Sequence, residues 1–597
     1  MSFIYEARIT QFSKDLKKYK SASRNLGFSR LLLFVLIFVG VYVYWGQTIP
    51  IALFLFGGGV LFLRLVVLNG KADTEIQYLD ALISINTNEN KAIHGKYQNP
   101  DNGSEFTRSD HEYSHDFDLF GLRSFFSKFN RTVTVQGKST LANWLTVPEL
   151  VISDIVKKQE GVKELVKKLD WRQDFLANGM INQLSQKDQD KITHWHELES
   201  ELRGVFIHKV TLTILPALTL LLLVGTILGY VSWVNFGWFL LVPLTFVGSQ
   251  LKKVNHEYGI ISNLVIKFEV LAKLTRKIET EEFDSELLKD WQAQLLASDS
   301  IKASQKLGQL KSLLGSFEQR SNMLVGIVLN AFLLWDLQLM QRMNQWKKEN
   351  SLELGTWLDI IGKFDATISL ANLSYNNNDF YYPEISNQEF EVFGKDMKHP
   401  MLETKKAVGN DFELKGQGSV NIITGANMAG KSTFLRTVGL NMVLGMMGAP
   451  VPVSNFKFSP MMIFSSMRTE DSLAEQTSFF YAELSRLARI SDILKAGEKR
   501  FVILDEILKG TNSHDKARGS YAFVEKMIRY NMMGLIATHD LSLCVLANKH
   551  PDKIENKSFE VEFNKDELVF DYKLRNRVCQ NMNASFLLKK MGIVDHY

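Results

Sequence analysis

Cysteine is nearly absent from this sequence. Only Cys544 and Cys579 occur, and neither sits in a metal-ligand spacing. A disulfide framework is therefore not expected, and a reducing compartment fits the bulk of the chain. Residues 1–30 are polar and basic, with no small-residue cleavage site after the first apolar run, so a cleavable signal peptide is not expected either.

No strong charge imbalance marks the chain, whose net charge is +4. This mild excess permits contact with nucleic acid or anionic lipid but does not indicate it. Hydrophobic residues make up 46% and charged residues 22% of the 597 residues. That mixture argues against disorder and against a wholly membrane-embedded fold, and it suits a soluble protein that carries a few membrane spans.

Charges are almost missing from two long apolar stretches. Leu31–Leu68 contains Arg64 as its only charge, and Val210–Ser249 contains none. Each stretch is long enough for two membrane-spanning helices, with turns near Gly46-Gln47 and Ser232–Asn235. A buried core hairpin is the alternative, but uncharged runs of this length are rare in soluble cores. Two transmembrane hairpins are therefore predicted.

Lysine and arginine lie outside the two short turns and flank the other ends of the hairpins. Both turns are therefore expected to face outward, and the N-terminus and the C-terminal domain to lie in the cytoplasm of a multi-pass protein of the cell membrane. A third apolar run, Leu324–Met340, contains Asn330 and Asp336. It is predicted to be a buried helix, because a span there would move the C-terminal domain outside.

The segment Ser419–Leu435, SVNIITGANMAGKSTFL, predicts a nucleotide site. An apolar strand leads into Gly425-x-x-x-x-Gly430-Lys431-Ser432 and then into a helix. The glycines let backbone N–H groups face the phosphates of ATP, Lys431 neutralises them, and the Ser432 hydroxyl coordinates Mg²⁺. The residues expected to bind the cofactor are Gly425, Ala426, Asn427, Met428, Ala429, Gly430, Lys431, Ser432 and Thr433.

Two further strands end in candidate catalytic side chains. Phe501–Leu504 is followed by Asp505 and Glu506, and Met533–Thr538 is followed by His539. Carboxylates at the carboxyl end of a buried parallel strand lie where ligands bind in open α/β sheets. Asp505 is expected to hold Mg²⁺ through water, Glu506 to orient and deprotonate the attacking water, and His539 to sense the γ-phosphate.

These motifs closely resemble the MutS family of mismatch-repair ATPases. TGANMAGKST resembles that family's TGPNMGGKST, with Ala426 and Ala429 in place of Pro and Gly, and DEILKGTNSHD resembles its DEIGRGTSTYDG. The stretch from Asp471 through Ser478 to Glu483 is similar to its D-D-L-A-x-G-x-S-T-F-M-x-E segment. Upstream segments also resemble the family, so that the likeness covers roughly 117–205 and 254–593.

The resemblance implies a homodimeric ATPase in which Ser478 approaches the γ-phosphate held by the partner subunit. It implies DNA binding only weakly, because the family's mismatch-reading domain has no counterpart before Phe117. Ala407 stands where many relatives have an aromatic residue that packs on adenine. Membrane lipid is the other expected partner.

The predicted fold class is multidomain, with an α/β P-loop (ABC-type) ATPase domain at the C-terminus, an all-α lever and core domain, and two transmembrane helical hairpins. The predicted parts are a basic N-terminus at 1–29, hairpin 1 at 30–69, a flexible linker at 70–115, the core at 116–209, hairpin 2 at 210–249, the core and lever at 250–384, and the ATPase domain at 385–597.

Two other functions stay open on these residues. An ABC-type transporter subunit is disfavoured because no LSGGQ-like sequence precedes Asp505 and only four spans are predicted. A membrane scaffold with a vestigial or switch-like nucleotide site is disfavoured by the intact Lys431, Ser432, Asp505, Glu506 and His539.

Overall fold

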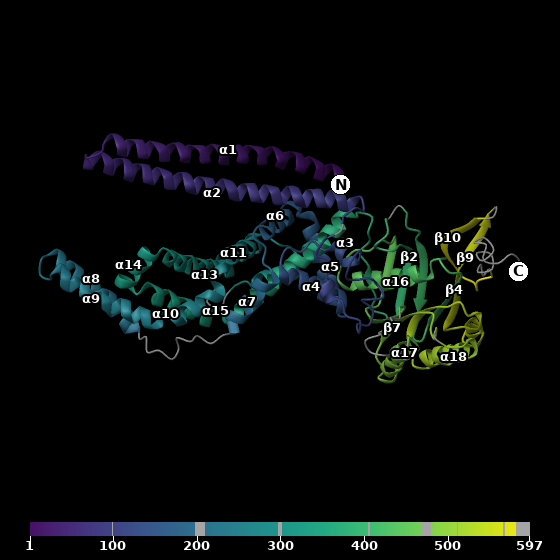
Figure 1. Ribbon diagram of the computed structural model, residues 1–597. Coiled ribbons are helices and arrows are strands. Elements are labelled where there is room, and N and C mark those ends of the chain that lie inside the picture. The colour runs from purple at the N-terminus through teal and green to yellow at the C-terminus, as the bar shows by residue number, and fades with distance from the viewer. Residues whose placement is uncertain are drawn as a thin grey trace.

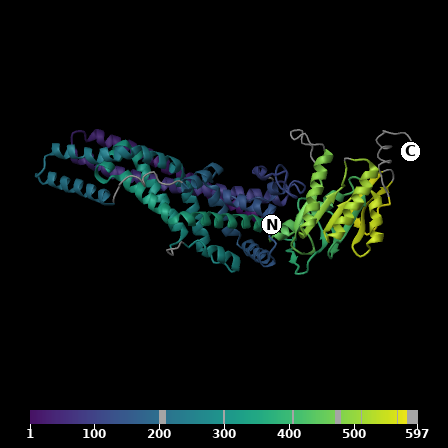
Figure 2. The ribbon, with the colours of Figure 1, turned by 90° about the horizontal axis from the view of Figure 1, so that it is seen from below.

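The protein is elongated, with its strands gathered at one end and long helices extending away from them (Figure 1). The computed structural model describes residues 1–97, 99–197, 209–296, 301–403, 406–468, 479–509, 511–564 and 567–580. The view from below gives the same arrangement, with the sheets at one end and the helices of residues 2–376, here called the arm, extending away from them (Figure 2). The chain is therefore multidomain and mostly helical, with mixed sheets in its C-terminal part.

The first part of the arm is a long helical hairpin of α1 (Ser2–Val43) and α2 (Thr48–Ile93), which contact each other along their length. The prediction of a flexible linker over 70–115 is wrong for its first part. Residues 70–93 continue α2, and its Ala72, Leu79, Leu82 and Ile85 are buried. Their helical spacing packs this half of α2 against the rest of the arm, including residues 169–180. The polar composition of Asn86–His115 concealed this order.

The start of α1 is tied to the base of the arm by buried polar side chains. The Tyr5 hydroxyl donates to Asn376 Oδ1 at 2.8 Å, and Asn376 Nδ2 donates to Glu89 Oε2 at 2.5 Å. Glu89 in turn pairs with Arg131 at 2.6 Å. Because Tyr5 and Glu89 are buried, these bonds fix the base of the hairpin beside the start of the C-terminal domain.

Helices α3 to α15 form the rest of the arm. Their bounds are α3 (Phe125–Phe129), α4 (Val135–Thr146), α5 (Ile152–Lys167), α6 (Leu169–Met180), α7 (Gln186–Glu197), α8 (Lys209–Ile227), α9 (Trp233–Phe239), α10 (Leu241–Ile261), α11 (Val265–Thr280), α12 (Glu286–Ala293), α13 (Ala303–Glu318), α14 (Met323–Leu333) and α15 (Trp335–Asn376). The helical spacing of Leu264, Phe268, Leu271 and Leu274 correctly predicts a core face, since all four are buried.

Three helical stretches among the described residues are long and apolar enough to cross a membrane: Ser2–Val43, Thr48–Ile93 and Trp233–Thr280. A shorter apolar helix, Thr211–Ile227, precedes the third. The closed end of the α1–α2 hairpin, α8, α9 and α14 all lie at the end of the molecule remote from the sheets (Figures 1 and 2).

The prediction that Leu324–Met340 is one buried helix is wrong for its first half. A residue with left-handed φ, Leu334, separates α14 from α15, and the two helices meet at 77°. Leu334–Met340 is largely buried, whereas Met323, Leu324 and Val328 expose more than half of their surface. Apolarity alone did not distinguish a core contact from an outward-facing side chain.

Asp365 in α15 is a fully buried carboxylate that accepts hydrogen bonds from the start of α4. The donors are the Val133 amide at 3.0 Å, the Thr134 amide at 2.8 Å and the Thr134 hydroxyl at 2.6 Å. Burial raises the pKa of Asp365 to about 7, against the lowering effect of these three bonds.

We expect Asp365→Asn to flatten the dependence of stability on pH. A carboxyl whose pKa is raised by folding stabilises most when protonated, below its ordinary pKa, and loses this stabilisation as pH rises through about 7. Wild type should therefore lose more thermal stability between pH 5 and pH 8 than the variant does. Thermal unfolding of both proteins at pH 5, 6, 7 and 8 measures this, and parallel curves would contradict it.

The C-terminal domain contains two sheets and the helices that cover them. Its strands are β1 (Glu384–Ile385), β2 (Glu391–Met397), β3 (Asn410–Lys415), β4 (Val420–Gly425), β5 (Asn455–Phe458), β6 (Met462–Ser466), β7 (Arg500–Asp505), β8 (Met533–Ala537), β9 (Ile554–Asn564) and β10 (Glu567–Arg575). Its helices are α16 (Lys431–Met446), α17 (Phe479–Lys495), α18 (Ser513–Arg529) and α19 (Leu546–Lys549). The strand orders are β1-β5-β2-β3 and β10-β9-β4-β8-β7-β6.

The six-stranded sheet is covered on both faces. Its five strands from β9 to β6 are parallel, and β10 pairs antiparallel with β9 at one edge. Ile423 and Ile503 pack in the core with α16, whereas Ile422 and Val502 pack in the core with α17 and α18. Alternation along each strand thus buries both faces and leaves the carboxyl ends of the strands free to form a site.

Candidate functional site

The glycine-rich loop joins the central strand β4 to helix α16. Gly425 and Gly430 have φ values of 148° and 110°, and a Cβ on Gly425 would lie 2.4 Å from the Phe559 carbonyl oxygen. Only glycine fits this close approach of two backbones. Met428, at the tip of the loop, has a φ of 65° and is 79% exposed, while Ala429 beneath it is buried.

Lys431 turns back over the loop that precedes it. Its Nζ donates to the carbonyl oxygens of Gly425 at 2.8 Å and Ala426 at 3.0 Å, and lies 3.1 Å from His539 Nε2. The side chain is only 6% exposed, and burial lowers the pKa of its ammonium group. A buried cation held by weak carbonyl partners is well placed to exchange them for an anion.

Ser432 and Asp505 meet although they are far apart in the sequence. The Ser432 hydroxyl, in the first turn of α16, donates to Asp505 Oδ2 at 2.5 Å. Asp505 ends β7, and the parallel strand β8 pairs with both β7 and β4. The carboxyl ends of these strands therefore share one edge, and the predicted pair of metal-ligand types comes together there.

Glu506 and His539 form the second polar pair of the site, with Glu506 Oε1 2.8 Å from His539 Nε2. The hydrogen bond with His539 lowers the pKa of Glu506 to about 2, although desolvation raises it. Glu506 also has a φ of 55°, which is strained for a side chain of this kind. Such an acidic carboxylate is suited to orienting water and is a weak base in this arrangement.

A cavity of about 620 Å³ opens beside the loop, and most of the predicted residues line it. From the predicted set these are Asn427, Met428, Gly430, Lys431, Ser432, Thr433, Asp505 and Glu506. Ser478, which the resemblance assigns to the partner's site, lies outside the described residues.

Sequence reasoning missed several other residues that line this cavity. Tyr572, on the antiparallel edge strand β10, lines it together with His399, Leu402 and Val408. Burial lowers the pKa of His399 to about 4, so its ring is neutral at neutral pH. Tyr572 thus brings an aromatic ring to the wall of the cavity. Its separation of more than a hundred residues from the loop left no local signal.

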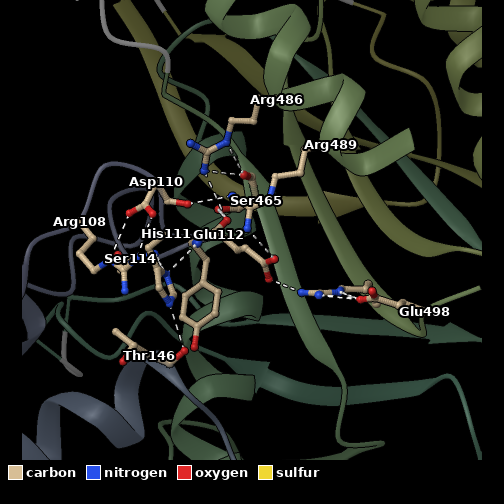
Figure 3. Close-up of polar contacts among 12 residues, drawn as sticks. Arg108, Asp110, His111, Glu112, Ser114, Thr146, Ser465, Arg486, Arg489 and Glu498 are labelled. Atoms are coloured by element: carbon tan, nitrogen blue, oxygen red, sulfur yellow. Dashed lines mark hydrogen bonds and ion pairs between the residues drawn. The ribbon is translucent and has the colours of Figure 1, made fainter. Parts of the chain in front are cut away.

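Residues 108–118, here called the strap, dock on the outer edge of the same sheet (Figure 3). The Ser465 amide, on the edge strand β6, donates to the Glu112 carbonyl at 2.9 Å. Two arginines of α17 reach over the strap: Arg486 donates to the Ser465 carbonyl at 2.8 Å, and Arg489 to the Asp110 carbonyl at 3.0 Å. The strap thereby covers a sheet edge that would otherwise be open.

Asp116 is the buried centre of this contact. It accepts hydrogen bonds from the Ser465 hydroxyl at 2.6 Å, the Met467 amide at 3.2 Å, the Arg468 amide at 2.9 Å and Arg486 at 3.2 Å. Asp118 continues the strap with ion pairs to Arg468 and to Arg436 of α16. The strap therefore connects the arm to the helix that begins at the glycine-rich loop.

The fold and its site place the C-terminal domain in one class of protein. This class has an α/β domain with a glycine-rich loop and acidic side chains at the carboxyl ends of parallel strands. Residues 421–590 match the family model for MutS domain V. The C-terminal part of the chain therefore belongs to the MutS family, as its motifs predict.

Individual relatives match the same part of the chain. The DNA mismatch repair protein MutS of Thermotoga sp. (strain RQ2) is 33% identical over 232 residues, which are 38% of this chain and 28% of that protein. MutS protein homolog 4 of Mus musculus is 30% identical over 235 residues, which are 38% of this chain and 24% of that protein. The chain thus spans less than a third of the length of these curated relatives.

Proposed function

We propose that this chain is a membrane-anchored ATPase that binds and hydrolyses Mg²⁺–ATP at the glycine-rich loop. The observation that carries the proposal is the convergence of Lys431, Ser432, Asp505, Glu506 and His539 beside one cavity. These residues come from the ends of two strands, β7 and β8, and the start of one helix, α16. Their chemistry is that of phosphate binding and water activation.

The residues present fit the nucleotide and its metal. The buried Lys431 ammonium donates to two carbonyl oxygens and lies beside an imidazole, and phosphate oxygens would be stronger partners than these. Ser432 and Asp505 supply a hydroxyl and a carboxylate, the oxygen donors that Mg²⁺ prefers. When bound, Mg²⁺ supplies charge neutralisation at the phosphates.

Glu506 and His539 then act on water and on the terminal phosphate. Glu506 is ionised at neutral pH and accepts a hydrogen bond, so it orients a water molecule for attack. His539 lies between Glu506 and Lys431, within 2.8 Å and 3.1 Å respectively, where it links the water site to the phosphate site. Tyr572 and Val408, which also line the cavity, give the base of the nucleotide an aromatic and an aliphatic surface.

Dimerisation and DNA binding enter the proposal from the family. The matched relatives include proteins named for DNA mismatch repair, which supports a DNA-related role. A homodimer in which Ser478 completes the partner's site fits the family resemblance of residues 471–483. The chain shares only its C-terminal part with those relatives, so the choice of DNA structure needs direct measurement.

Membrane anchoring rests on the two apolar hairpins. Phe38 is 72% exposed and Leu63 65% exposed in the first, and Leu221 is 67% exposed in the second. Exposed apolar surface on this scale is unfavourable in water and favourable in lipid. Both closed ends lie at the same end of the molecule, so one bilayer accommodates both (Figure 1). The basic residues flanking the hairpins favour an ATPase domain in the cytoplasm.

Phosphate release by the full-length protein in liposomes tests the proposal. We expect Mg²⁺-dependent ATP hydrolysis, and stimulation by duplex, mismatched or branched DNA if the DNA role is correct. Turnover no greater than that of heat-denatured protein would overturn the enzyme. Turnover that no DNA structure changes at low salt would remove the DNA role while leaving the ATPase.

A further inference from the structure

Helix α14 presents an apolar surface that the rest of the described chain does not cover. Its sequence, MLVGIVLNAFL, has no charged residue. Its exposed residues are Met323 at 76%, Leu324 at 77%, Val325 at 41%, Ile327 at 43% and Val328 at 55%. Five large apolar side chains on two turns of one helix form a continuous patch and need a partner.

Contacts with the second hairpin fix where α14 lies. Arg320, three residues before α14, donates to Asn255 of α10, which follows the basic pair Lys252-Lys253 closely. At the other end, the Phe332 ring lies 6.2 Å from the Phe236 ring of α9, near the closed end of that hairpin. Helix α14 therefore starts at the basic boundary of the second hairpin and runs toward its apolar tip.

Helix α14 alone is too short for a complete crossing. It has 11 residues, or about 16 Å of helix, against a hydrocarbon core of about 30 Å. At Leu334 the chain turns by 77° into α15. Gln338 of α15 donates to the carbonyl oxygen of Leu212, near the start of α8, so the chain has returned toward the boundary.

An ion pair closes the neck of this excursion. Arg320 lies three residues before α14 and Asp336 three residues after it, and their side chains are 3.3 Å apart. The Asn330 side chain also accepts a hydrogen bond from the Asp336 amide at 3.0 Å. Entry and exit of α14 are thus held together on one side, as in a loop that dips into an apolar medium and returns.

We propose that α14 is a re-entrant element that inserts partway into the bilayer beside α8 and α10, with lipid as the partner of its exposed face. This inference rests on the membrane anchoring in the proposed function. Such an element adds a third lipid contact, from the helix that leads through α15 to the C-terminal domain, and both of its ends stay on the side of that domain.

Depth-dependent fluorescence quenching tests the proposal. The two native cysteines are first removed by Cys544→Ser and Cys579→Ser. Single cysteines are then introduced at Val328, at Leu221 of α8 and at Leu352 of α15. Each is labelled with an environment-sensitive fluorophore in liposomes that contain lipids brominated at defined depths. Leu352 is the matched control. It is a large apolar residue that is 88% exposed, but it lies well beyond the bend at Leu334, in the stretch of α15 that leads to the C-terminal domain.

We expect quenching at Val328 of at least half that at Leu221, and none at Leu352. Quenching at Leu221 alone would overturn the re-entrant helix and leave the anchoring intact, whereas quenching at neither site would overturn the anchoring itself. Disulfide crosslinks between copies at Val328, without lipid quenching, would assign the face to a second copy of the chain and overturn lipid as its partner.

Sidedness separates a re-entrant helix from a full span. Cysteines at Glu318 and Arg342, on either side of α14 and both exposed, should react with a membrane-impermeant maleimide only from the side of the C-terminal domain. Reaction of one site from each side would mean that α14 crosses the bilayer, and the proposal would fail.

Discussion

Replacing Glu506 with glutamine is expected to lower ATP turnover by about 100-fold or more while leaving ATP binding intact. Glutamine keeps the size of the side chain and its oxygen acceptor but removes the charge, which wild type holds at every pH above about 2. The loss falls on the water-orienting step alone, because Lys431 and Ser432 are unchanged. Phosphate release and binding of a fluorescent ATP analogue, measured on the same preparation, separate the two effects.

Two further variants sharpen this experiment. Lys431→Met should abolish nucleotide binding itself, since it removes the cation beside the loop. Glu525→Gln changes a glutamate on α18 that pairs with Lys549, outside the site, and should alter turnover less than twofold. Because nucleotide stays bound, Glu506→Gln should also accumulate dimers in ATP. Near-wild-type turnover of Glu506→Gln would mean that another group activates water.

The bond between Glu506 and His539 adds a condition to this mechanism. A carboxylate whose pKa is near 2 takes up a proton poorly, so proton abstraction by Glu506 requires the His539 contact to loosen. A phosphate that accepts the His539 N–H in place of Glu506 would free this carboxylate to act as a base.

The part of the site built from strand ends was predictable from sequence. Once Gly425 and Asp505 are assigned to the carboxyl ends of parallel strands, packing brings them to one edge of the sheet, whatever the intervening chain does. Ser432 and His539 follow directly because each lies within a few residues of such an end. The order of residues along the chain therefore determines most of the geometry of the candidate site.

Features made by distant contacts were not predictable in the same way. Tyr572 reaches the cavity because an antiparallel strand folds back along the sheet, and nothing near it in sequence marks that return. The strap around Asp116 has the composition of a flexible loop. Its order was not predictable, because it comes from partners beyond residue 460. The exposed face of α14 was not predictable, because an apolar side chain on a helix can face either a protein core or the outside.

The strap supplies the second large effect, which we expect for Asp116→Ala. The substitution removes the acceptor of the Met467 and Arg468 amides and takes one partner each from Arg486 and the Ser465 hydroxyl. Removing one partner of a buried charged contact costs about 3 kcal/mol or more. The amides of Met467 and Arg468 should then exchange hydrogen roughly 100-fold faster, which mass spectrometry of peptides from this edge measures.

Asp110→Ala is the matched control, because Asp110 lies on the same strap but is exposed and pairs with Arg108. Its removal should change exchange at Met467 and Arg468 less than threefold, since exposed ion pairs contribute little. Equal exchange in the two variants would show that backbone pairing alone holds the strap. A selective effect of Asp116→Ala would mean that one buried carboxylate joins the arm to residues flanking 469–478, the stretch that contains Ser478. Movement of the arm would then be linked, through Asp116, to the segment that completes the partner's site in the proposed dimer.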